Sequence, residues 1–238
     1  MSVPVALVII GAGGVGRELV DLVDSINAVD RRFELRGFLD DGGPEKAAFL
    51  RRGVRLLGGV SELSALHVKY VIGIGSPSVR RRIDAFASSL GREAVSLVHP
   101  TAVLGGDVRL GEGTVVYSHV SVTTNVETGR HVQLHVNCAV GHDSRLGDYV
   151  TVLPGATVAG GVTLEEGVTV GANAAVVQGL RVGAMSVVGA GAAVIRDLPP
   201  GTTAVGVPAR ALADRRAEES VEDRQQPGAR QDSWSKHR

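Results

Sequence analysis

The chain has 238 residues, with 32 glycines but only four Phe, three Tyr and one Trp. A hydrophobic content of 44% excludes a wholly disordered chain, and glycine without a three-residue period excludes collagen. Lys plus Arg equals Asp plus Glu at 25 each, so no net charge attracts the chain to nucleic acid or to an anionic membrane. So few rings predict a core of small branched side chains in many short strands.

Cysteine usage and the N-terminal sequence indicate the compartment. The single cysteine, Cys138, permits neither an intrachain disulfide nor a metal site built from cysteines, which is typical of a reducing compartment. The apolar segment at residues 3–10 is too short to span a membrane and is not preceded by basic residues. We therefore expect a soluble, cytoplasmic protein with no nucleic-acid or membrane partner.

Residues 5 to about 98 alternate between apolar runs and amphipathic stretches. We expect strands at residues 5–10, 34–39, 54–57 and 69–74, and helices at residues 14–27 and from Ser76 or Ser78 to about residue 90. Strands that alternate with helices predict a parallel sheet with right-handed crossovers. The segment is too short for the usual two-half dinucleotide domain, so we expect an α/β, Rossmann-like half domain.

A glycine-rich turn follows the first expected strand. Gly11, Gly13 and Gly16 fit the pattern G-x-G-x-x-G, and Gly14 and Val15 complete the turn. Backbone N–H groups of such a turn, together with the N-terminus of the next helix, bind a diphosphate.

Polar residues follow two other expected strands at the same edge of the sheet. Asp40 and Asp41 end the second strand, within reach of a ribose or a base edge. Gly75 and Ser76 follow the strand at residues 69–74 and form the expected third edge of the pocket. On their own, these residues favour NAD as the ligand.

From Val98 onward the sequence follows a six-residue repeat. Seventeen positions spaced six apart run from residue 98 to residue 194, and sixteen of them are Val or Leu, with Thr128 the exception. This register predicts an all-β solenoid, in which each repeat buries its apolar residue against its neighbours. Three hexads make one triangular coil, so residues eighteen apart are expected to stack on successive coils.

Glycines and the chain end complete the predicted solenoid. Glycine follows the periodic residue at eight positions, where we expect a turn that needs its conformational freedom: Gly105, Gly111, Gly129, Gly141, Gly147, Gly171, Gly183 and Gly189. Residues 199–201 and 206–210 are the expected closure of the solenoid. Residues 214–238 are charged and polar and predict a mobile tail.

The hexad register, the glycine-rich opening, Gly141-His142-Asp143 and the closing segment 205–210 together resemble a known family. It is the sialic-acid-O-acetyltransferase-like group, with its relatives the bacterial nucleotide-aminosugar N-acetyltransferases. The resemblance covers residues 5 to 212. It implies a left-handed parallel β-helix, a homotrimer, acetyl-CoA as cosubstrate without a metal, and a nucleotide-linked amino sugar as acceptor.

The resemblance also assigns the parts of the chain. Residues 1–95 are the expected Rossmann-like nucleotide-sugar-binding domain, residues 96–212 the left-handed β-helix acyltransferase domain, and residues 213–238 a disordered tail. In this context the glycine-rich turn is expected to bind a nucleotide diphosphate sugar rather than NAD.

His142 is the expected general base. It lies two residues after the periodic Val140, at a corner of the coil, and an imidazole titrates near neutral pH, as acyl transfer to an amine requires. Asp143 is expected to orient the ring and stabilise its charged form. Gly160, eighteen residues after His142, is expected beside it as an oxyanion donor. The resemblance implies the same roles; the alternative is a surface His–Asp pair and an ordinary turn glycine.

The resemblance implies further CoA contacts in a groove between neighbouring solenoids, at Gly171, Gly189, Pro208 and Arg210. Two other positions depart from the family pattern. Thr151 stands where the aminosugar enzymes often carry a second His, and Val15 stands where they usually carry His. These departures fall where the thioester or the acceptor is held, so a contact to one of them is expected to be missing.

Several reactive or charged side chains are expected to be structural. His119 and His135 are expected at surface turns, although they are near enough in sequence to compensate for Thr151. Cys138 is expected in a packing position rather than as a nucleophile. Arg80-Arg81-Arg82 is expected to form a solvated helix face.

Three other functions stay open at this point. O-acetylation of a sugar such as sialic acid uses the same base. A zinc hydratase of the carbonic-anhydrase type needs three converging His side chains, but His131, His135 and His142 fall on different phases of the coil. A non-catalytic nucleotide-sugar-binding protein binds its ligand without releasing CoA.

Overall fold

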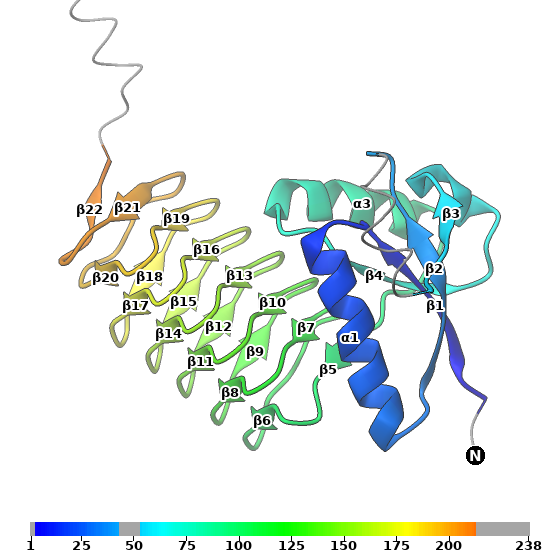
Figure 1. Cartoon of the computed structure of the whole chain (residues 1–238). Coiled ribbons are helices and arrows are strands. Elements are labelled where there is room, and N and C mark those ends of the chain that lie inside the picture. The colour runs from blue at the N-terminus through cyan, green and yellow to red at the C-terminus, as the bar shows by residue number, and fades with distance from the viewer. Residues whose placement is uncertain (1–2, 43–52, 213–238) are drawn as a thin grey trace, which may run out of the picture.

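The structure is a computed structural model that describes residues 3–42 and 53–212. The expected tail at residues 213–238 lies outside the described residues. A small α/β part formed by the first hundred residues sits at one end of a long stack of triangular coils, and the chain reaches the other end of the stack near residue 212 (Figure 1).

The N-terminal part is built on a parallel four-stranded sheet in the order β3-β2-β1-β4. Its elements are β1 Val5–Ile10, α1 Gly14–Val29, β2 Phe33–Leu39, β3 Leu56–Gly58, the 3-10 helix Val60–Ser64, β4 Lys69–Ile72 and α3 Pro77–Ser89. Leu7 and Ile9 of β1 pack under α1, whereas Val8 and Ile10 pack under α3. The two helices therefore cover opposite faces, as the alternating pattern predicts. None of the helices among the described residues is long and apolar enough to cross a membrane.

The solenoid consists of short parallel strands that form three sheets, one on each side of the coil. The eight-stranded sheet contains β5 Leu97–Val98, β7 Val115–Val116, β10 Gln133–Leu134, β13 Thr151–Val152, β16 Thr169–Val170, β19 Val187–Val188, β21 Thr203–Val205 and β22 Arg210–Ala211. The six-stranded sheet contains β6 Val103–Leu104, β8 Ser121–Val122, β11 Ala139–Val140, β14 Thr157–Val158, β17 Ala175–Val176 and β20 Ala193–Val194. The four-stranded solenoid sheet contains β9 Glu127–Thr128, β12 Arg145–Leu146, β15 Thr163–Leu164 and β18 Arg181–Val182.

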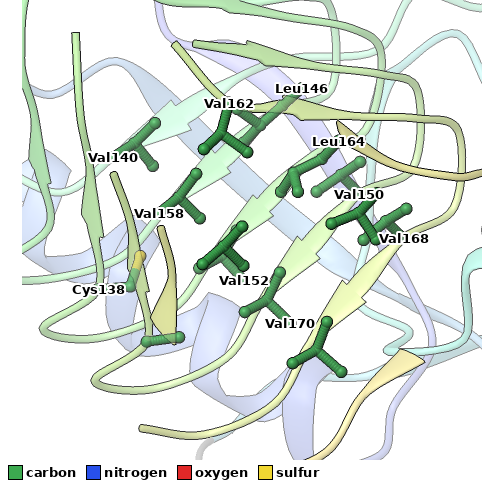
Figure 2. Packing of buried hydrophobic residues seen from close by; sticks show 14 of the residues in the cluster. Cys138, Val140, Leu146, Val150, Val152, Val158, Val162, Leu164, Val168 and Val170 are labelled. Atoms are coloured by element: carbon green, nitrogen blue, oxygen red, sulfur yellow. The ribbon is translucent and has the colours of Figure 1, made fainter. Parts of the chain in front are cut away.

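Successive coils from β5 to β20 pair at a spacing of eighteen residues, as the three-hexad coil predicts, and the closing strand β21 pairs with β19 at a spacing of sixteen. Val140 pairs with Val158, and Val152 pairs with Val170. Their side chains point into the interior of the coil, where they stack in columns (Figure 2). The fold is therefore a left-handed parallel β-helix whose core is a stack of small branched side chains.

The one exception in the hexad series is satisfied inside the coil. Thr128 Oγ1 accepts a hydrogen bond from the Gly111 N–H at 3.0 Å and lies 3.3 Å from Thr114 Oγ1. This half-buried hydroxyl therefore has polar partners, which removes most of the cost of placing it beside valines.

The expected reason for the eight periodic glycines is wrong. None of them has a positive φ; the left-handed residue of each turn lies two positions later, for example Asp143 with φ 60° after Gly141 and Gly191 with φ 67° after Gly189. What these glycines provide is space for the next coil. A Cβ on Gly147 would lie 2.7 Å from the backbone N of Glu166, and one on Gly141 would lie 2.5 Å from that of Gly160.

The expected closure forms a small hairpin. β21 adds to β19, and β22 pairs with β21 in the antiparallel direction. The connecting segment also covers the end of the six-stranded sheet, because the Ala193 N–H donates to Gly206 O at 3.0 Å and the Ala209 N–H donates to Ala193 O at 2.7 Å. The last coil is thereby protected from further strand pairing.

Gly147→Ala tests whether coil-to-coil contact limits these positions. The methyl group would meet backbone atoms of the next coil, so we expect a loss of about 1–3 kcal/mol in the free energy of unfolding, measured by chemical denaturation. Gly106→Ala is the matched control, because its nearest atom would be Thr124 Oγ1 at 3.9 Å. Equal stability of the two variants would contradict the packing explanation.

Candidate functional site

His142 and Asp143 form a hydrogen-bonded pair at the turn that follows β11. His142 Nδ1 and Asp143 Oδ2 are 2.7 Å apart, and Asn125 on the preceding coil donates to Asp143 Oδ1 at 3.1 Å. The hydrogen bond from His142, followed by that from Asn125, holds the pKa of Asp143 below its usual value. With Nδ1 engaged, Nε2 is the ring nitrogen left to exchange a proton. Both side chains are exposed.

Gly160 lies against the imidazole, as the eighteen-residue spacing predicts. A Cβ on Gly160 would lie 2.5 Å from His142 Nε2 and 2.6 Å from Cε1. Only a residue without a side chain leaves the ring in place and keeps the space beside Nε2 open. The geometry therefore joins the two expected catalytic positions; their roles stay predictions.

The Gly160 N–H belongs to a turn position whose N–H can bind an anionic oxygen. At the equivalent position of two other turns, the Arg130 N–H donates to Asp148 Oδ1 at 2.8 Å and the Ala184 N–H donates to Glu165 Oε2 at 2.7 Å. Among the described residues, no acceptor takes the Gly160 N–H. This donor is therefore available to a negatively charged oxygen beside His142.

The residues expected to contact CoA border one face of the solenoid. Gly171 and Gly189 follow β16 and β19, at the corner where the chain enters the six-stranded sheet, and His142 stands at the corner where it leaves. The loop with Pro208 covers the last strand of this sheet, and Arg210 follows it in β22. All five residues therefore border the six-stranded sheet. Gly171 and Gly189 lie at one edge, His142 lies at the opposite edge, and Pro208 and Arg210 lie at its C-terminal end.

The strand ends of the N-terminal sheet border a cavity of about 470 Å³. Its lining residues are Gly11, Leu39, Asp40, Asp41, Gly42, Val60, Ser61, Ile74, Val79, Arg82, Ile83 and Phe86. Three of the sequence-predicted acceptor residues are among them. The cavity therefore lies where a doubly wound sheet binds its ligand.

The two aspartates shape the loops around this cavity. The Ala12 N–H donates to Asp40 Oδ2, and the Gly42 N–H donates to Asp40 Oδ1, each at 2.7 Å. Asp41 Oδ1 accepts the Val60 N–H at 2.8 Å. Asp40 thereby joins the glycine-rich turn to the end of β2.

The remaining predicted acceptor residues do not line this cavity. Gly13 is the N-cap of α1 without a side-chain cap, so the first N–H groups of the helix, from Gly14 through Val15 and Gly16, are available to an anion. A Cβ on Gly16 would overlap the carbonyl oxygen of Gly11, so close packing requires glycine at this position.

Gly75 and Ser76 have structural partners. Arg80 donates to the Gly75 carbonyl oxygen at 2.7 Å, and Ser76 Oγ lies 3.1 Å from Ser78 Oγ. Ser76 is the N-cap of α3, although its side chain makes no capping hydrogen bond.

Arg80 is not part of a solvated helix face; this expectation is wrong. Its side chain is fully buried, and its guanidinium donates to the carbonyl oxygens of Ile74 and Tyr149 and to Thr151 Oγ1. Gln133 Oε1 is a further acceptor at 3.3 Å. Arg80 therefore joins α3 to the solenoid. Arg81 and Arg82 on the same helix are exposed, as expected.

Asp84, one turn after Arg80, is the centre of a second buried contact. Tyr149 donates to Asp84 Oδ2 at 2.7 Å, and Arg130 donates to Oδ1 at 2.8 Å. His131 Nε2 lies 3.0 Å from Oδ1, and Tyr70 donates to the same oxygen at 2.9 Å. Burial by itself raises the pKa of Asp84, but the contacts to His131, Arg130 and Tyr149 outweigh it and hold the pKa far below its usual value.

Sequence reasoning missed Arg80 and Asp84 because their partners lie far away in the chain. The only local signal is that the two residues are four apart and share a helix face with the buried Ile83 and Ala87. Thr151 stands where the resemblance leads one to look for a second His. It is buried under α3, and its hydroxyl accepts a hydrogen bond from Arg80.

Of the other three residues expected to be structural, His119 and Cys138 lie where the sequence predicts and His135 does not. His119 is exposed at a turn with φ 57°, as expected. His135 is not a surface residue; it is buried and its ring stacks on Tyr117 at a centroid distance of 4.9 Å. Cys138 is buried in the coil, and burial raises its pKa to about 12, so the thiol stays protonated. Within the described residues, no three His, Cys, Asp or Glu side chains are grouped to hold a metal ion.

Comparison with known proteins gives matches to both halves of the chain. Residues 6–84 match the family described as PglD N-terminal domain. The chain is 30% identical over 155 residues to GDP-perosamine N-acetyltransferase from Escherichia coli O157:H7, a match that covers 64% of this chain and 69% of that protein.

Solved structures extend the match to almost the whole described fold. A histidine-to-asparagine variant of perosamine N-acetyltransferase from Caulobacter crescentus, in complex with CoA and GDP-perosamine, has a TM-score of 0.81 and 30% identity over 88% of this chain and 97% of that chain. The acetyltransferase domain of PglB from Neisseria gonorrhoeae FA1090, in complex with acetyl coenzyme A, has a TM-score of 0.78 and 28% identity over 88% of this chain and 100% of that chain.

Asp84→Asn tests the junction between α3 and the solenoid. Because the native pKa of Asp84 is depressed, the stabilisation by its charge is fully present above the unfolded-state pKa of about 4 and is lost as the pH falls towards the native value. We expect a loss of about 3–5 kcal/mol in the free energy of unfolding at pH 7, shrinking below about pH 4. The exposed Asp107→Asn is the control and should change stability little. A pH-independent difference would contradict the assignment.

Proposed function

This chain belongs to the family of bacterial nucleotide-aminosugar N-acetyltransferases, and from that premise we propose that it transfers acetyl directly from acetyl-CoA to the amine of its acceptor with His142 as the general base. The family's reaction is an acyl transfer with acetyl-CoA as the cosubstrate and a nucleotide-linked amino sugar as the acceptor. The observation that carries our assignment is the contact between the His142 ring and Gly160 across two coils.

The proposed transfer proceeds in a ternary complex. His142 Nε2 removes a proton from the amine as the amine nitrogen attacks the thioester carbon, and a new C–N bond forms. Asp143 holds the Nδ1–H side of the ring and stabilises the imidazolium. The Gly160 N–H donates to the oxyanion of the tetrahedral intermediate. The C–S bond then breaks, and the imidazolium returns its proton to the departing thiolate.

We further propose where the two substrates lie. The nucleotide occupies the cavity that Gly11, Asp40 and Asp41 border, and its diphosphate meets the uncapped N-terminus of α1. CoA follows the outer face of the six-stranded sheet, between the corner with Gly171 and Gly189 and the loop with Pro208 and Arg210. The outward side chains of this sheet are small, which lets an extended cofactor approach closely.

The proposal includes a homotrimer and a cytoplasmic location. The His142 and Asp143 side chains are 54% and 57% exposed in a single chain, and a second solenoid against this corner would shield them from water. A single, buried, unpaired cysteine suits the cytoplasm. We also propose that the chain divides near residue 95 into a half that binds the acceptor and a solenoid half that carries the transfer chemistry.

The activity is tested by thiol release from acetyl-CoA with UDP-, dTDP- and GDP-linked 4-amino-6-deoxysugars. We expect thiol release with one member of the panel and an N-acetylated product by mass spectrometry. His142→Ala should lower kcat/KM at least about 100-fold, because a general base contributes about 10²–10⁴. A near-normal rate in this variant would exclude His142 as the base, and an O-acetylated product would change the acceptor group.

Gly160→Ala tests the space beside the base. The new methyl group would meet His142 Nε2, so the ring or the thioester must move, and a displacement of about 1 Å can cost about 100-fold in kcat. Gly106→Ala is the matched control, since Gly106 occupies the same turn position three coils earlier in the stack and has free space around it. Wild-type turnover by Gly160→Ala would contradict the assignment.

A further inference from the structure

One column of the solenoid core contains a polar side chain on the coil that carries His142. The column lies at the corner between the six-stranded sheet and the four-stranded solenoid sheet. From residue 108 to residue 180 its other members are aliphatic, namely Val108, Val126, Val162 and Leu180, whereas Ser144 is polar and is 0% exposed. A hydroxyl buried among aliphatic side chains is costly unless it is hydrogen-bonded, so its partners indicate its role.

Ser144 is hydrogen-bonded to the turn that contains Gly160. Its hydroxyl donates to the carbonyl oxygen of Ala159 at 3.0 Å and accepts the Val162 N–H at 3.2 Å. Among the described residues, no backbone N–H donates to the Ala159 carbonyl, so Ser144 is its partner. This carbonyl belongs to the same peptide unit as the Gly160 N–H, the proposed oxyanion donor.

The hydrogen bond from Ser144 determines where the Gly160 N–H points. In a planar trans peptide, the C=O and the N–H point in opposite directions. Because the Ala159 carbonyl points inward to Ser144, the Gly160 N–H points outward, to the surface of the coil on which His142 is exposed. A hydrogen bond to the carbonyl oxygen also polarises the peptide, which makes its N–H a stronger donor.

Another corner of the solenoid shows the same arrangement together with an outer acceptor. There the buried Thr114 donates to the carbonyl oxygen of Gly129 at 3.3 Å. The N–H of the same peptide unit, on Arg130, donates outward to Asp148 Oδ1 at 2.8 Å. An inward hydroxyl and an outward anionic oxygen therefore bind the two ends of one peptide. The Ala159–Gly160 peptide has the same inward hydroxyl, and its outward N–H faces the proposed thioester site.

We infer that Ser144 is a positioning residue for the proposed transfer, and that it fixes and polarises the Ala159–Gly160 peptide from inside the coil so that the Gly160 N–H meets the thioester oxygen. This role rests on the proposed function. Ser144 touches neither substrate, because it is completely buried. Its effect is on kcat more than on KM, since the negative charge on the thioester oxygen develops only in the transition state.

Steady-state kinetics of thiol release tests Ser144 with two replacements of nearly equal size. Ser144→Val removes the hydroxyl and introduces the residue that Val126 and Val162 supply on the neighbouring coils, whereas Ser144→Thr keeps a hydroxyl. With the acceptor of the panel that wild type uses best, we expect Ser144→Val to lower kcat about tenfold and to leave both KM values within about twofold, because a weakened oxyanion donor costs less than a removed one. Ser144→Thr should retain the wild-type kcat.

Thr114→Val is the matched control. It removes the equivalent inward hydrogen bond from the Gly129–Arg130 peptide, and it also places valine in a column that contains valine, for example Val132. It should lower the Tm about as much as Ser144→Val does and leave kcat unchanged. A wild-type kcat in Ser144→Val, or an equal loss of kcat in Thr114→Val, would overturn the inference.

A binding measurement separates this inference from the proposed function. Acetyl-CoA and ethyl-CoA differ only in the thioester carbonyl, and isothermal titration calorimetry without an acceptor compares their affinities whether or not the chain transfers acetyl. We expect wild type and Thr114→Val to prefer acetyl-CoA, and Ser144→Val to lower this preference about threefold. A wild type without the preference, or a Ser144→Val protein that keeps it in full, would overturn the inference. A wild type that prefers acetyl-CoA but releases no thiol contradicts the proposed function instead.

Discussion

The backbone ladder between successive coils is the constraint on which the rest of the molecule depends. Each coil before the closing segment takes eighteen residues, and its strands hydrogen-bond to those of the next coil without a shift in register, as in the pairs Ala139 with Thr157 and Thr157 with Ala175. Side chains eighteen apart are therefore held about 4.8 Å apart along the stack. The contact of His142 with Gly160 and the stacking of Tyr117 on His135 are both consequences of this spacing.

A buried polar junction fixes the N-terminal part on this stack. Arg80 and Asp84 leave α3 on the same side and meet backbone and side-chain partners on the solenoid. Removing one partner of such a contact costs more than the contact contributes, because a charge is left buried and unpaired. The orientation of the nucleotide cavity relative to the solenoid therefore depends on a few residues, and neither Arg80 nor Asp84 lines that cavity.

The sequence predicts the parts of the fold that repeat and misses those that join distant segments. The hexad series gives the coil, its eighteen-residue period and the neighbourhood of His142, since each follows from local spacing. Arg80 looks like a surface residue because it stands in a run of three arginines, and its acceptors Gln133 and Thr151 lie more than fifty residues away. His135 is misread for the same reason: Tyr117, on which its ring stacks, lies on the preceding coil, and α1, which lines a pocket together with it, is remote in the sequence.

The periodic glycines show a second limit of sequence reasoning. A glycine in a repeat indicates either a positive φ or a close neighbour, and the sequence does not separate the two. In this fold Asn, Asp and His residues take many of the left-handed positions, for example Asn125, Asn137 and His119, while Gly141 and Gly147 provide space for the next coil. The distinction matters at Gly160, where the neighbour is the imidazole of His142.

The central claim is that the corner formed by His142 and Gly160 binds the reacting thioester. A crystal structure of the full chain with acetyl-CoA tests it most directly. We expect the thioester carbonyl oxygen within hydrogen-bond distance, about 3 Å, of the Gly160 N–H, with the carbonyl carbon beside His142 Nε2. A thioester bound away from this corner, with the Gly160 N–H still open, would contradict it.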